Sequence, residues 1–353
     1  MVAIFTTSTV LDQICHSDEL NPWQDMIMKL GEVFTTEDID IPLDDEDPLF
    51  LLDASIKIDT SKDNLIKAVL TEPKKVLEEP CGIYLLDIPS AYAKSIQDSY
   101  GVICQSLSVM DHSALTKIHG SAEQVEGERG KDWKDIFKKF KNSPTNSALI
   151  IDAHLFENDY WDERQDCYDQ SRNYGLVNLR EIIEEILPDT FSDTYHIGVL
   201  LTDTDEAKAK RKSRTNLTNA QIATAINKLK KRISRSYPIS IEVLFFSSGD
   251  DHHKLIHNRR ILTNTYVLDA QYKLAALSNG IARASQTIYI YPLFELIHMG
   301  SDEEMKEKRL RYDLDDLYEY IQIQCRAQAP SGQLYRNGAL MDSYFKIQHR
   351  FLR

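Results

Sequence analysis

Short apolar runs alternate with amphipathic segments along the chain, and this alternation predicts the strands and helices of an α/β protein. In the N-terminal part, "PCGIYLLDIP" predicts a strand ended by proline, "SAYAKSIQDSY" a helix and "GVICQSLSV" a returning strand. We therefore expect residues 1–118 to form a smaller α/β domain with a parallel or mixed sheet. The sequence contains no catalytic spacing there that would indicate its role.

A polar stretch bounded by Gly, Ser and Pro follows, and it predicts a linker over residues 119–147 with a short helix inside it. Trp133, Ile136, Phe137 and Phe140 recur at i, i+3, i+4 and i+7, which gives one apolar helical face with lysines opposite. Such a face is typical of a helix packed on a domain. A membrane-surface or partner-binding helix is the alternative.

Residues 148–353 predict a second domain in which strands and helices alternate. The predicted strands are "SALIIDAHLF", "YHIGVLLTDTDE" and "ISIEVLFFSS", and the helices between them are "NLREIIEEIL" and "TNAQIATAINKLKKRI". This order favours a mixed, mostly parallel sheet flanked by helices. Two more predicted helices, over residues 301–328 and 340–352, are expected to cover the sheet or to form a subunit contact.

Several polar side chains follow the predicted strands of this second domain. In α/β sheets, ligands gather at the carboxyl ends of strands. We therefore expect the candidate residues to lie near one another at that edge, and these residues are Asp152, His154, Asp203, Asp205 and His257.

The charge is acidic overall but uneven. A net charge of −14 over 353 residues disfavours a surface coated for nonspecific DNA binding, which requires Lys and Arg. Ten Lys and Arg nevertheless lie between Lys208 and Arg235 with no acidic residue among them. This basic segment is either a solvated helix face or a guide for a polyanion, and aromatic residues for base stacking are absent from it. Its candidate phosphate or nucleic-acid ligands are Lys208, Lys210, Arg211, Lys212 and Arg214.

Other classes of protein are disfavoured by composition. The five cysteines form no CxxC pair, which argues against disulfides and a cysteine zinc site. No apolar run approaches the ~20 residues of a membrane-spanning helix, and the first residues lack the features of a signal peptide. We therefore expect a cytoplasmic protein without a membrane span and without a cofactor.

The stretch "HKLIHNRRILTN" carries the strongest candidate chemistry, as His257-x-Arg259 followed by four residues and Asn264. A histidine can attack a phosphodiester and form a phosphohistidine if a cation neutralises the phosphate oxygens. The spacing resembles the HxKxxxxD motif of the phospholipase D superfamily, with Arg and Asn in place of Lys and Asp. Arg259 keeps the cationic role, because arginine binds phosphate bidentately. The Gly-Ser that commonly follows in that superfamily is replaced by Gln271 and Tyr272.

Residues 148–277 resemble a particular branch of this superfamily, the phospholipase D-like domain with an H-x-R signature found at the C-terminus of some MIT-domain proteins and in prokaryotic proteins. The resemblance rests on the order of "LIIDAHLF", "GVLLTD" and "HNRRILTN". It implies an α/β sandwich that pairs as a homodimer and a metal-independent phosphodiesterase, most plausibly a nuclease. His257 would be the nucleophile, Arg259 would hold the phosphate, and Asn264 with Asp152 or His154 would orient the site. Its relatives also suggest a defence or DNA-processing system, with a protein partner on the N-terminal domain.

Three other interpretations remain open from the residues. The first is a catalytically degenerate, dimerising scaffold that binds phosphate. In a purely structural variant of this interpretation, His257 and Arg259 only bond to a strand-end carboxylate such as Asp152. The second is a Mg²⁺ site built from Asp152, Asp203 and Asp205. The third is a transition-metal site at His252, His253 and His257.

Overall fold

The computed structural model describes two α/β units joined by a packed junction. The described residues are 3–17, 21–30, 32–36, 46–50, 57–109, 125–126, 132–138, 140–141, 143–169, 171–210, 215–247, 256–257, 259–270, 274, 277–278, 281–282, 287–292, 319, 333–343 and 346–353.

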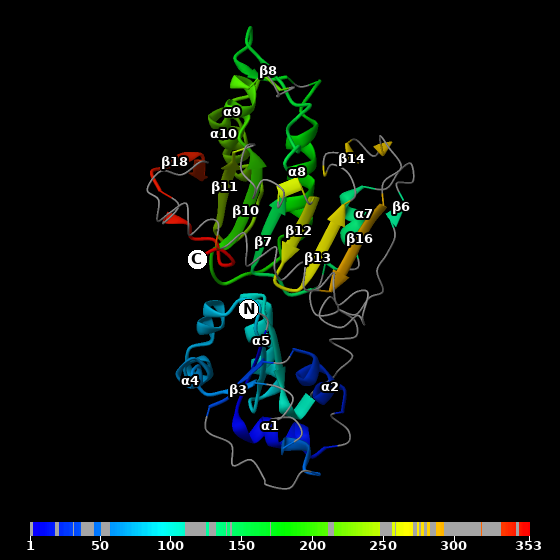
Figure 1. The fold of residues 1–353 in the computed structure, drawn as a ribbon, viewed down its shortest axis with the longest axis vertical. Helices are drawn as coiled ribbons and strands as arrows, with labels where there is room; N and C mark the ends of the chain where they lie inside the picture. The colour runs from blue at the N-terminus through cyan, green and yellow to red at the C-terminus, as the bar shows by residue number, and fades with distance from the viewer. Residues whose placement is uncertain are drawn as a thin grey trace.

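The N-terminal unit is a five-stranded, entirely parallel sheet in the order β3-β2-β1-β4-β5, with helices on both faces (Figure 1). Helices α1 and α2 share one apolar cluster with the sheet, and α4, η2 and α5 pack on the other face. The described residues of this region are therefore α/β, and the sheet is parallel. The elements are β1 (Ile4–Thr6), α1 (Ser8–Cys15), α2 (Asn21–Leu30), β2 (Glu32–Phe34), β3 (Lys57–Asp59), α4 (Asp63–Thr71), η2 (Pro73–Glu78), β4 (Ile83–Leu86), α5 (Ser90–Tyr100), β5 (Ile103–Ser106) and η3 (Leu107–Val109).

The C-terminal unit contains a nine-stranded sheet in the order β18-β17-β11-β10-β7-β12-β13-β16-β6. Its strands are β6 (Val125–Glu126), β7 (Ser147–Ile151), β10 (Tyr195–Thr202), β11 (Ile239–Phe246), β12 (Arg259–Thr263), β13 (Tyr266–Ala270), β16 (Thr287–Pro292), β17 (Gln333–Arg336) and β18 (Ala339–Met341). Two small hairpins stand apart from this sheet, β8 (Trp161–Asp162) with β9 (Cys167–Tyr168) and β14 (Leu277–Ser278) with β15 (Ile281–Ala282). The helices are α7 (Trp133–Phe137), α8 (Tyr174–Ile186), α9 (Thr204–Ala209) and α10 (Asn219–Lys230).

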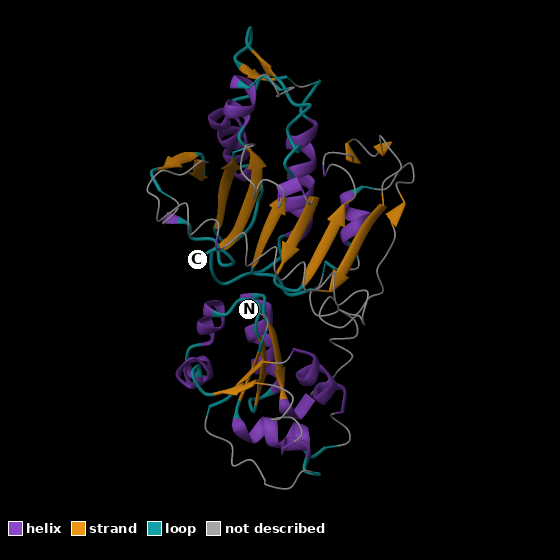
Figure 2. Ribbon diagram, viewed as in Figure 1, coloured by secondary structure: helices purple, strands orange, loops and turns teal. Residues whose placement is uncertain are grey.

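This sheet is mixed and flanked by helices, as predicted, but it is not mostly parallel. Only β7, β10 and β11 run parallel to one another, and every other pairing in the sheet is antiparallel. Helices α7, α8 and α10 lie on one face (Figure 2). The central strands are buried along their whole length because both faces are covered, which explains their continuous apolar sequence.

The predicted linker contributes its described residues to the C-terminal unit. Strand β6 pairs with β16 at the edge of the sheet, and α7 packs on the sheet's helical face. All four apolar residues of the predicted amphipathic face are buried, and the ring of Phe140 lies 5.3 Å from that of Tyr266. Trp133 Nε1 donates to Asn178 Oδ1 at 2.8 Å. The helix is therefore a packed element of the domain.

The two predicted C-terminal helices have different outcomes. Residues 301–328 lie outside the described residues except for position 319. The prediction of a helix over 340–352 was wrong, because Leu340 and Met341 belong to β18 and the described residues after them form turns. Ile347 and Leu352 pack instead on the sheet face opposite the helices.

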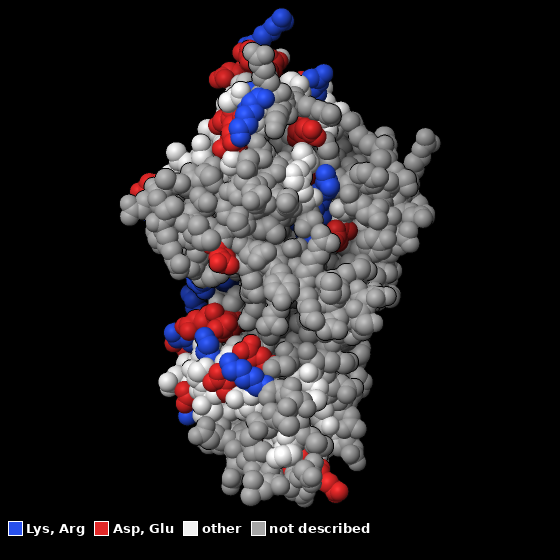
Figure 3. All heavy atoms as spheres, in the orientation of Figure 1, with Lys and Arg blue, Asp and Glu red and all other residues white. Residues whose placement is uncertain are grey.

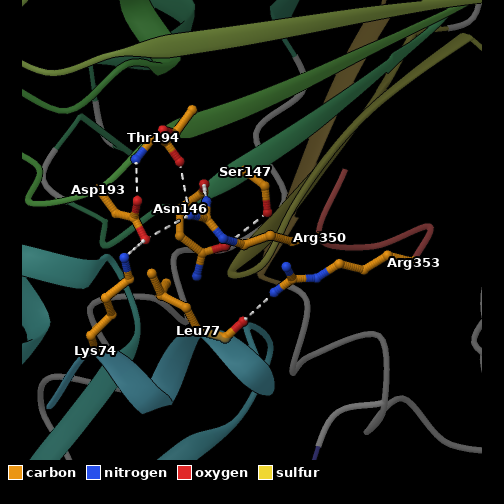
Figure 4. A network of polar contacts seen from close by, with 8 residues as sticks. All are labelled: Lys74, Leu77, Asn146, Ser147, Asp193, Thr194, Arg350 and Arg353. Carbon is orange, nitrogen blue, oxygen red and sulfur yellow. Dashed lines mark hydrogen bonds and ion pairs between the residues drawn. The ribbon is translucent and has the colours of Figure 1, made fainter. Parts of the chain in front are cut away.

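Polar contacts around the C-terminal residues lie at the junction between the two units (Figure 4). Arg350 donates to the backbone oxygens of Asn146 at 2.6 Å and Thr194 at 2.8 Å within the C-terminal unit, and Arg353 donates to Leu77 O of the N-terminal unit at 3.0 Å. Lys74 pairs with Asp193 at 3.1 Å. One continuous apolar cluster also contains residues of both units. The units therefore pack directly on each other.

Candidate functional site

The carboxyl end of β7 and the amino end of β12, two neighbouring central strands, lie side by side at the same end of the C-terminal sheet. The two strands are antiparallel, with Arg260 paired to Ile151, so their opposite ends coincide (Figure 1). Asp152 and His154 directly follow β7, and His257 directly precedes β12. A backbone hydrogen bond of 2.9 Å from Ala153 N to Ile256 O ties the two segments together.

The rings of His154 and His257 lie against each other at this end of the sheet. Their centroids are 5.0 Å apart and the planes are inclined by 46°. Both side chains are partly buried. His257 therefore lies next to His154, in a helical turn before the strand and not on the strand itself.

Burial lowers the pKa of His257, and the positive charge of Arg259 lowers it further. The imidazole is therefore neutral at neutral pH. Arg259 begins β12 and is partly buried. Its Nε is buried and has no hydrogen-bond partner among the described residues. An unpaired buried donor of a guanidinium group favours an anionic ligand.

Asp152 accepts backbone hydrogen bonds from the segment that carries His154 and from Leu274. The side chain is fully buried; Oδ1 accepts from His154 N and Oδ2 from Leu274 N, both at 2.8 Å. One carboxylate oxygen thus holds the backbone N–H of His154, and the other holds that of Leu274. Asp152 is therefore a positioning residue for the turn that carries His154.

Asn264 does not reach this site, because it follows the opposite end of β12. The five residues of that strand span roughly 17 Å. Its buried side chain accepts from Asn146 N at 3.0 Å and donates to Gly101 O at 2.7 Å. The predicted grouping of Asn264 with His257 is corrected accordingly: Asn264 links the two units at their junction.

Lys208 and Lys210, at the start of the basic segment, have partners within the protein. Lys208 Nζ donates to Asn216 O at 2.6 Å, and Lys210 pairs with Glu206 one helical turn away. On the face drawn in Figure 3, the described Lys and Arg side chains alternate with Asp and Glu and form no continuous basic patch. Three other candidates lie outside the described residues, namely Arg211, Lys212 and Arg214.

The acidic residues proposed for Mg²⁺ have structural partners. Asp203 caps α9 by accepting from Glu206 N at 3.0 Å and also accepts from Asn219 Nδ2 at 2.9 Å. Asp205 Oδ2 accepts from Asn219 N at 3.3 Å. Among the described residues, no group of three or more His, Cys, Asp or Glu is placed to hold a metal ion. His252 and His253 lie outside that part of the chain.

Sequence reasoning missed that His154 and His257 touch within one chain. The sequence carries a signal for this contact: His154 closely follows one strand and His257 closely precedes another, so antiparallel pairing of the two strands brings the histidines together.

In the described part of the chain, the four cysteines are free and no helix has the length and apolar character needed to span a bilayer. No protein-family model and no curated protein matches this chain.

Proposed function

We propose that the chain is a phospholipase D-like protein that binds and cleaves a phosphodiester, with nucleic acid as the substrate class. The observation that supports this most is the convergence of His154, His257 and Arg259 on one strand edge above the buried carboxylate of Asp152. Two imidazoles and a guanidinium group are the groups that metal-independent phosphoryl transfer requires.

In the proposed reaction, a neutral His257 nitrogen attacks phosphorus and forms a P–N bond while the P–O bond to the leaving group breaks. The leaving oxygen takes a proton from His154, which acts as the general acid. Water then attacks phosphorus, His154 accepts the proton of that water, and the P–N bond breaks to release the phosphomonoester. Arg259 neutralises the non-bridging oxygens throughout.

The lowered pKa of His257 suits the nucleophile, because only the neutral ring can attack. Both histidines belong to the same chain, so the proposed chemistry does not require a second subunit. The homodimer implied by the family resemblance, and its place in a defence or DNA-processing system, remain proposals of their own.

A cleavage assay on single- and double-stranded DNA and RNA, with and without EDTA, tests the proposal. H257Q and H154Q should each abolish an EDTA-resistant cleavage, and the wild-type protein should carry an acid-labile phosphorus label that H257Q lacks. H16Q is the matched control, because His16 is exposed on the N-terminal unit. Cleavage that survives H257Q, or that EDTA abolishes, contradicts the proposal.

A second candidate is a catalytically degenerate module that binds phosphate without cleaving it. The position of Asn264 favours it, because the residue that replaces the motif carboxylate is engaged at the junction. Absence of cleavage together with anion binding that R259Q weakens would support this alternative.

A further inference from the structure

A pocket of about 220 Å³ lies between α8 and α10, closed at one end by the β8–β9 hairpin. The hairpin contributes Trp161 and Tyr168, α8 contributes Arg180, α10 contributes Lys228, and Arg232 lies two residues beyond the end of α10. None of these residues belongs to the histidine site.

The pocket is cationic although the chain is acidic. Its lining includes Arg180, Lys228 and Arg232 but no aspartate or glutamate. The Arg180 side chain has a loose contact with Glu184, at 4.0 Å, while the side chains of Lys228 and Arg232 have no ion pair or hydrogen bond among the described residues. Three cations gathered without a carboxylate repel one another, and a bound anion relieves that repulsion.

The pocket also offers aromatic and apolar surface. The rings of Trp161 and Tyr168 are 5.8 Å apart in an edge-to-face arrangement, and Leu176, Val177 and Leu229 complete the apolar part of the lining. Trp161 is partly exposed. Aromatic side chains bind nucleobases by stacking. Inorganic phosphate has no ring to stack on them, and a purely apolar ligand would not require the three cations.

The geometry points to a nucleotide-binding site in this pocket, with the base against Trp161 and Tyr168 and the phosphate on Arg180, Lys228 and Arg232. At about 220 Å³ the pocket is smaller than the roughly 300 to 1,000 Å³ that drug-sized ligands occupy, so part of the nucleotide lies outside it. The nucleotide is either free or one unit of a single strand. The site is independent of chemistry at His257, although the segment that carries Trp161 and Tyr168 begins at His154.

Tryptophan fluorescence tests this directly. The chain has three tryptophans, Trp23, Trp133 and Trp161, and only Trp161 is not fully buried. Titration of the full chain with AMP or a short oligothymidylate should quench its emission, and W161F should lose the quenching. Quenching by AMP alone indicates a free nucleotide, whereas stronger binding of the oligonucleotide indicates a strand; both support a nucleotide site.

The charge is tested with exposed residues, so that folding is preserved. The double variant K228Q/R232Q should weaken binding by about tenfold or more, because two charge-assisted contacts are lost. K231Q is the matched control: Lys231 is exposed at the end of the same helix but does not line the pocket. The inference is overturned by an absence of quenching, by equal quenching in K228Q/R232Q, or by inorganic phosphate competing as well as AMP. H257Q should bind AMP like the wild type, which separates this result from the cleavage assay.

Discussion

Replacement of Asn264 separates a role in catalysis from a role at the junction. In N264A, the backbone N–H of Asn146 loses its acceptor in a buried environment, while Gly101 O keeps a second donor in Asn146 Nδ2 at 3.2 Å. An orphaned buried N–H costs about 1 to 3 kcal/mol, and the vacated volume adds to it. We expect the free energy of unfolding to fall by about 2 to 3 kcal/mol in total.

N264D restores the carboxylate of the phospholipase D motif and gives the sharper test. One carboxylate oxygen still accepts from Asn146 N, but the other faces Gly101 O in the position of the lost 2.7 Å donor. Ionisation there is unfavourable, so the pKa of the introduced carboxyl rises above its unfolded value. Stability is then lost as pH rises above about 4 and is regained as the carboxyl protonates and donates to Gly101 O.

Urea unfolding followed by circular dichroism at pH 7 and pH 5 measures this effect, with wild type as the reference. N264D should be clearly less stable than wild type at pH 7 and closer to it at pH 5. Its cleavage activity per folded molecule should not exceed that of the wild type. A variant with wild-type stability at pH 7 and increased cleavage would show that position 264 acts at the histidine site, which refutes the reasoning.

Two further perturbations test the packing of the C-terminal residues and the junction between the units. His349 is buried, its Nδ1 accepts from Phe351 N and its Nε2 lies 3.0 Å from Ala148 O, so burial lowers its pKa to about 3. Below about pH 6.5 the unfolded state therefore binds a proton that the folded state does not, and the free energy of unfolding should fall by about 1.4 kcal/mol for each pH unit of acidification. In H349Q, the urea midpoint should depend less steeply on pH than in the wild type. Gly101 has φ of 59° and an added Cβ would lie 2.0 Å from Thr145 O, so G101A should cost about 2 to 4 kcal/mol in thermal unfolding, and an unchanged melting temperature would contradict this.

The strands were predictable where burial on both faces leaves a continuous apolar run, as in 147–151, 195–202 and 239–246. The proximity of His257 to Asp152 was predictable because both lie at strand ends. The direction of β12 was not, since the same residues fit a parallel or an antiparallel neighbour.

The errors share a physical cause, which is that spacing in sequence does not fix position in space. Asn264 is seven residues from His257, but an extended strand carries it to the other end of the sheet. Residues 340–352 carry a helical pattern, yet Ile347 and Leu352 pack on the sheet face and Arg350 bonds to Asn146 O. The aromatic residues absent from the basic segment are supplied by a hairpin about sixty residues earlier in the chain.

The packed junction also has a thermodynamic consequence for ligands. Because polar contacts and one apolar cluster cross between the units, opening one unit exposes buried surface of the other. A partner that binds only the N-terminal unit would then raise the melting temperature of the C-terminal unit as well. A ligand of the N-terminal unit can therefore stabilise the fold around His154 and His257 without contacting either residue.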